Sequence, residues 1–75
     1  MDWPAAQRFV ADLESGARRD LLRVLTTSSE VRADLIGQLY RRAGGQDMAE
    51  LLTLLEEREW ARQAMIEELR AGSRA

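Results

Sequence analysis

The sequence contains neither cysteine nor histidine, and this limits how so short a chain can be held together. Domains below about 80 residues commonly need disulfides, a structural metal or self-association, because their apolar cores are small. Without thiols or imidazoles, disulfides and the usual zinc sites are excluded. The 75 residues therefore predict one small domain, stabilised by its own apolar core or completed by a second copy of the chain.

Apolar residues recur at helical spacing in the N-terminal third of the chain. Asp2 as a cap, Pro4 in the first turn and the Ser15-Gly16 pair as a stop predict a first helix over residues 3–15. A second, short helix is expected over residues 17–25, and it should end in the hydroxyl-rich run that starts at Thr26.

A third helix is expected from Val31 to Ala43, where apolar residues follow one another in steps of four. Thr27 and Glu30 have the spacing of a capping box at its start. The Gly44-Gly45 pair should terminate it, because glycine adopts the conformations that end helices at little cost.

The fourth segment contains no helix breaker before Gly72 and is capped in the sequence by Asp47, with Glu50 three residues later. About 25 helical residues at about 1.5 Å each would form a rod of roughly 37 Å. The expected fold is therefore all-α: a compact four-helix domain over residues 1–71, with three short helices packed on one long C-terminal helix. Residues 72–75 are expected to be a frayed tail.

A helical wheel of this fourth segment shows two apolar sectors that are out of phase. The first runs from Met48 to Leu55 and can be covered by the other helices. The second is either ordinary core under the first helix or an exposed apolar patch, and such patches mark interaction surfaces. We expect the second alternative, with two arginines as flanking contacts, so that the predicted partner-binding residues are Trp60, Met65, Ile66, Leu69, Arg58 and Arg62.

DNA binding is the alternative function. The segment from Arg18 to Leu25, the third helix, the Gly44-Gly45 turn and the fourth helix together resemble a helix-turn-helix. The resemblance implies a regulator that uses Arg-rich helices 2 and 3. However, the helix that would enter the major groove carries acidic side chains, which phosphates repel, and the sequence has no asparagine to read adenine. Nucleic acid is therefore not the expected partner.

Catalysis is not expected either. Neighbouring carboxylates such as Glu56 and Glu57 point about 100° apart on a helix, so they cannot work as a pair. Nucleophilic triads built on Ser28 or Ser29 would need a histidine. The Gly44-Gly45 turn lacks the lysine of a phosphate-binding loop. The sequence thus predicts no catalytic, cofactor-binding or metal-binding residue.

All eleven basic residues are arginine, and lysine and asparagine are both absent, a pattern typical of a GC-rich bacterial or phage genome. The chain has no apolar run long enough to span a membrane and no signal-peptide core, so we expect a cytoplasmic protein without membrane contact. The expected function is protein–protein recognition by a small regulator, inhibitor or adaptor, which docks its C-terminal amphipathic helix on another protein or on a second copy of itself.

Overall fold

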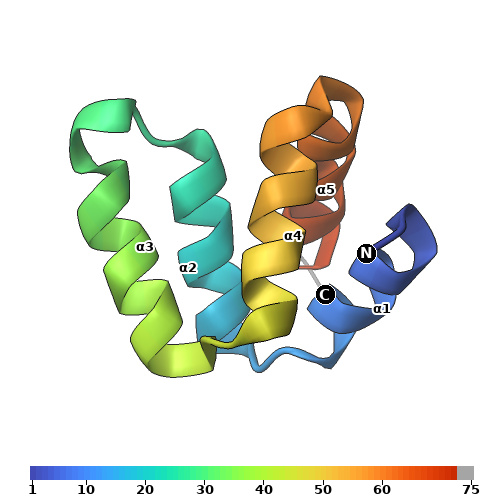
Figure 1. Cartoon of the computed structure of the whole chain (residues 1–75), viewed down its shortest axis with the longest axis horizontal. Coiled ribbons are helices and arrows are strands. Elements are labelled where there is room, and N and C mark those ends of the chain that lie inside the picture. Colours follow the sequence, from blue (N-terminus) through green and yellow to red (C-terminus); the bar gives the residue numbers. More distant parts are fainter. Residues whose placement is uncertain (73–75) are drawn as a thin grey trace.

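The computed structural model describes residues 1–72, which form five helices (Figure 1). They are α1 (Trp3–Asp12), α2 (Ser15–Thr26), α3 (Ser29–Ala43), α4 (Gln46–Glu57) and α5 (Glu59–Gly72). No strand occurs in the described residues, so the all-α class is confirmed. The predicted count of four helices is wrong, and so is the single long C-terminal helix. Of the predicted tail, Gly72 belongs to α5, and 73–75 lie outside the described residues.

The chain breaks at Arg58, where one continuous helix was expected. The backbone of Arg58 is extended, with φ −124° and ψ 102°. Its N–H donates to the carbonyl of Leu54 at 3.0 Å and closes α4. Its carbonyl accepts from the N–H groups of Ala61 at 3.0 Å and Arg62 at 3.1 Å, and so opens α5. One residue therefore satisfies backbone groups at the end of one helix and at the start of the next.

The break brings the two out-of-phase apolar sectors onto the same core. A straight rod of roughly 37 Å would exceed the longest dimension of the molecule, which is 28 Å. After the break α5 packs beside α4. Apolar side chains of both helices are then buried together: Met48, Leu51, Leu55, Ala61, Met65, Ile66 and Leu69.

The start of α1 is formed as predicted, but its end is not. Asp2 caps the helix, because its Oδ1 accepts from the N–H of Ala5 at 2.9 Å, and Pro4 lies in the first turn. The helix ends at Asp12 rather than at residue 15. Ser15 and Gly16 do not stop it; they form the first turn of α2.

A side chain from α2 takes over the role that Gly16 was expected to play at the end of α1. Nη1 of Arg18 donates to the carbonyl of Leu13 at 2.6 Å and to that of Ala11 at 3.3 Å. These carbonyls lie at the helix end, where they have no partner within the helix. The guanidinium therefore satisfies them without a glycine.

The two predicted capping boxes are also not formed. The residues at the N-cap positions of α3 and α4 are Ser28 and Gly45, and neither makes a side-chain capping bond. Asp47 instead lies in the first turn of α4, where its charge favours the helix dipole. The expected end of α3 is confirmed: the helix ends at Ala43, and the N–H of Gly44 donates to the carbonyl of Tyr40.

Gly45 provides a test of the turn between α3 and α4. Its φ of 148° and ψ of −176° lie in a region that is accessible essentially to glycine alone. We expect Gly45→Ala to lower the free energy of unfolding by about 1–3 kcal/mol, measured by urea denaturation. Gly37 is the matched control: it lies inside α3, and an added Cβ would meet no atom within 4 Å. Gly37→Ala should raise stability by up to about 1 kcal/mol; the same sign for both variants would contradict the assignment.

Helices α2 and α3 lie on one side of α4 and α5, and α1 lies on the other side (Figure 1). The pair α2 and α3 packs together, α2 also packs along α5, and α4 packs on α5. Among the residues of α3 only Leu39 is buried, whereas α2, α4 and α5 each bury at least three residues. Helix α3 is therefore packed less deeply than these three. None of the helices in residues 1–72 is long and apolar enough to cross a bilayer.

Candidate functional site

The structure separates the six residues that were predicted to bind a partner. Met65, Ile66 and Leu69 are buried, with exposed fractions of 1%, 7% and 6%. The expectation that these three form an exposed patch is wrong, because α5 turns back onto the core after Arg58. The alternative interpretation, ordinary core, holds for them. Trp60, Arg58 and Arg62 remain wholly or partly at the surface.

Trp60 is the most exposed large apolar side chain in the described residues, at 56%. It lies at the start of α5 and contacts Trp3 of α1 edge to face, with 5.3 Å between the ring centres and 67° between the planes. This geometry is favourable for aromatic pairs. We call the two rings the tryptophan pair. Arg58, two residues before Trp60, is also exposed.

Arg62 makes hydrogen bonds within the domain. Its Nη1 donates to the carbonyl of Leu25, at the C-terminal end of α2, at 2.9 Å. The other side of the guanidinium meets Glu59 with two bonds, Nη2 to Oε1 at 2.9 Å and Nε to Oε2 at 3.3 Å. The planar fork of arginine permits both contacts at once. Arg62 thus ties α5 to α2 and is not a free flanking charge.

The contact with Arg62 lowers the pKa of Glu59. Hydrogen bonds from Arg62, and after them from Gln63, lower the pKa of Glu59 from 4.5 to about 2. Since the folded pKa lies below the unfolded value, the contribution of this group is complete above about pH 4.5 and is lost as the pH falls towards 2. An NMR titration of the Glu59 carboxyl should show this low midpoint, and Arg62→Gln should move it back towards 4.5. An ordinary midpoint in the unmodified protein would contradict the contact.

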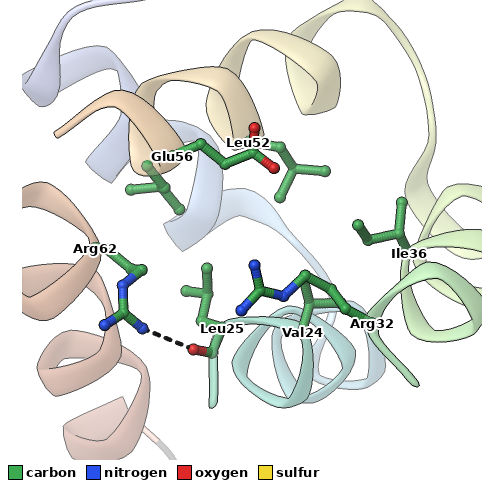
Figure 2. Close-up of a pocket in the computed structure, with 8 residues that line it drawn as sticks. Val24, Leu25, Arg32, Ile36, Leu52, Glu56 and Arg62 are labelled. Atoms are coloured by element: carbon green, nitrogen blue, oxygen red, sulfur yellow. Dashed lines mark hydrogen bonds between the residues drawn. The ribbon is translucent and has the colours of Figure 1, made fainter. Parts of the chain in front are cut away.

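A second surface feature is a small cleft lined by four helices (Figure 2). Its volume is about 30 Å³, roughly the room that two water molecules need. Most of its wall is aliphatic, and three charged side chains complete it. The lining residues are Val24 and Leu25 from α2, Arg32 and Ile36 from α3, Leu52, Leu55 and Glu56 from α4, and Arg62 from α5. We call it the α3–α4 cleft.

Two charged side chains face each other across this cleft without forming an ion pair. Figure 2 shows the guanidinium of Arg32 extending into the cleft and the carboxylate of Glu56 on the α4 side. Nη2 of Arg32 donates to the carbonyl of Thr27 at 3.3 Å, but its Nε is buried and has no partner. Within residues 1–72, Glu56 has neither an ion pair nor a side-chain hydrogen bond.

Sequence reasoning missed the cleft, although part of its signal is present. Arg32 and Ile36 are four residues apart, and so are Leu52 and Glu56, which places each charged residue beside an aliphatic one on one helix face. That α3 and α4 present these faces to the same space depends on how both helices pack against α2 and α5. The spacing alone contains no such information.

The arginines considered for DNA binding are distributed unevenly. Arg42 pairs with Asp20 at 2.9 Å and with Glu14 at 3.3 Å, and Arg18 caps α1. Arg19, Arg23 and Arg41 are exposed. The guanidinium groups on α2 and α3 are thus partly engaged in holding the helices together.

Comparison of the chain with protein-family models, with curated proteins and with solved structures finds no match. The function must therefore be argued from the surface of this chain.

Proposed function

We propose that this chain is a non-enzymatic protein–protein interaction module, a small bacterial or phage regulator, inhibitor or adaptor that acts in the cytoplasm. The observation that carries the proposal is the exposure of Trp60, at 56% of its side chain and backbone surface. Tryptophan is enriched among the residues that dominate binding energy at protein interfaces. A small domain that leaves more than half of a tryptophan exposed has apolar surface to offer a partner.

The tryptophan pair is suited to this role because Trp3 packs against the exposed ring of Trp60. Trp3 contacts Trp60 edge to face, so the exposed ring is restrained before a partner arrives. Restraint in the free protein reduces the entropy that binding must remove. Arg58 precedes Trp60 by two residues and is exposed, and its guanidinium can pair with a carboxylate at the rim of the interface.

The partner of this surface is another protein or a second copy of the chain. Met65, Ile66 and Leu69 do not contribute to it, because the core buries them. DNA binding is disfavoured by the ion pairs of Arg42 and by the capping role of Arg18, which engage two of the guanidinium groups on α2 and α3 within the fold.

The experiment compares proteins captured from cells of the source organism by the tagged chain and by its Trp60→Ser variant. We expect specific partners to be lost with Trp60→Ser. Val31→Ser is the matched control, since Val31 is 47% exposed on α3 and lies outside the tryptophan pair. Sedimentation at high concentration distinguishes a second copy from a different protein. The same captured set and the same mass for the original chain and for Trp60→Ser would contradict the proposal.

A further inference from the structure

The connection between α1 and α2 consists of two residues, and neither of them is a helix breaker (Figure 1). Leu13 and Glu14 have extended backbone, with ψ of 148° and 161°. Leucine and glutamate are both good helix formers. The local sequence therefore does not require the chain to leave the helical conformation here.

The apolar pattern runs through this connection without a change of phase. If one helix extended through Leu13 and Glu14, six apolar residues would lie within about 80° of one another, at about 100° per residue. They are Ala6, Val10, Leu13, Ala17, Leu21 and Val24. At Arg58, by contrast, the apolar sectors on the two sides are out of phase, so a break is needed there to bury both. Between α1 and α2 the pattern favours one continuous helix over residues 3–26.

The backbone carbonyls at the connection have partners in either form. In the structure, Nη1 of Arg18 donates to the carbonyls of Ala11 and Leu13. In a continuous helix these carbonyls accept from the N–H groups of Ser15 and Ala17, four residues further along. The start of α2 has no side-chain capping bond that would be lost. The connection can therefore straighten without leaving these carbonyls unpaired.

Helix α1 is the shortest helix of residues 1–72, and side chains outside the connection hold it in place. Of its ten residues only Ala6 and Val10 are buried. Its contacts with α5 include the tryptophan pair and a hydrogen bond from Nε2 of Gln7 to Oε1 of Glu68 at 3.1 Å. The surface that receives α1 can therefore receive the identical helix of a second copy.

We propose that two copies of this chain exchange α1. In the exchanged dimer, residues 3–26 form one helix, and the α1 part of each copy takes the place of the other copy's own α1. Trp3 then contacts Trp60 of the partner subunit, so the second copy completes the tryptophan pair. Exchange of an element through a short connection is an established route to dimers.

The exchange rests on the proposed function, because it makes a second copy the partner of the surface around Trp60. The contacts of α1 are the same in both forms. The balance between monomer and dimer therefore depends on the connection and on the protein concentration.

The test measures the mass of the whole chain by sedimentation over a range of concentrations, together with two variants of Glu14. Glu14→Pro fits the connection of the monomer, because φ of Glu14 is −66° and ψ of Leu13 is 148°. Inside a continuous helix, proline would lack the N–H that donates to the carbonyl of Val10. The association constant of the dimer should fall at least about a hundredfold, since proline disfavours a helix interior by at least that factor.

Glu14→Ala is the matched control. It removes the same carboxylate, including its ion pair with Arg42 at 3.3 Å, but alanine favours the helical conformation. This variant should form at least as much dimer as the original chain. Circular dichroism verifies that both variants are folded.

A second experiment detects the exchange directly. The chain has no cysteine, so a copy with Gln7→Cys and a copy with Glu68→Cys each carry one thiol. The two copies are unfolded and refolded together, and a short bismaleimide linker is added. Because the side chains at these two positions are in contact, exchange brings thiols of different chains together. We expect a covalent heterodimer, and we expect Glu14→Pro in both copies to prevent it.

Three results would each overturn the exchange: a chain that stays monomeric at every concentration, a dimer that Glu14→Pro forms as readily as Glu14→Ala, or a dimer that gives no covalent product. Monomeric chains that lose captured partners with Trp60→Ser would leave the proposed function standing. An exchanged dimer whose captured proteins and mass do not change with Trp60→Ser would leave only the exchange.

Discussion

Replacing Met65 by alanine is expected to lower the free energy of unfolding by about 2–5 kcal/mol. The side chain is 1% exposed and belongs to the core cluster, so the change removes apolar contacts and leaves a cavity. The effect is large for this chain, because a domain of its size has a total stability of only roughly 4–11 kcal/mol. Urea denaturation followed by circular dichroism measures the difference.

Met65→Leu is the control, since it conserves volume and should cost less than about 1.5 kcal/mol. The pair of variants also decides between the two interpretations of the second apolar sector. A core residue gives a large loss of stability with alanine and a small one with leucine. If Met65→Ala instead left stability unchanged and abolished binding to a partner, the side chain would belong to an interface.

Much of the fold could be predicted from the sequence because its signals are local. The step of four from Val31 to Ala43 and the two glycines that follow define α3 to within a few residues. Asp2 and Pro4 mark the start of α1 equally well. Each signal acts through groups within one or two turns, so no knowledge of the packing is needed to interpret it.

The break at Arg58 could not be located in this way. Neither glycine nor proline occurs between residues 46 and 71, and the backbone turns at an ordinary arginine. The only trace is the phase shift between the two apolar sectors. A straight helix with an exposed second sector and a broken helix with a buried one both explain that pattern. The burial of Met65, Ile66 and Leu69 favours the broken helix, and the free energy gained by burying these side chains exists only in the folded chain.

The candidate site was predicted only in part for the same reason. Trp60 is exposed as expected, but the use of Arg62 at the end of α2 depends on two helices far apart in sequence. The partner of Arg62 is a backbone carbonyl, which every residue possesses, so no residue type signals it. The Arg32 and Glu56 side chains likewise meet across a cleft that four helices create.

Leu39→Ala is the second change with a large expected effect, a loss of about 2–5 kcal/mol in the free energy of unfolding. Leu39 has no exposed surface and is the only fully buried side chain among the residues of α3. Because α3 packs mainly against α2, we expect the loss to be concentrated in α3. Hydrogen exchange should show that the amides of α3 lose more protection than those of α5.

Val31→Ala is the control for Leu39→Ala, because Val31 lies on the same helix and is 47% exposed. It should change stability by no more than about 0.5 kcal/mol. Equal loss of protection in all five helices would instead mean that α3 unfolds only together with the rest of the domain, and Leu39 would then hold the whole core rather than one wall of the cleft.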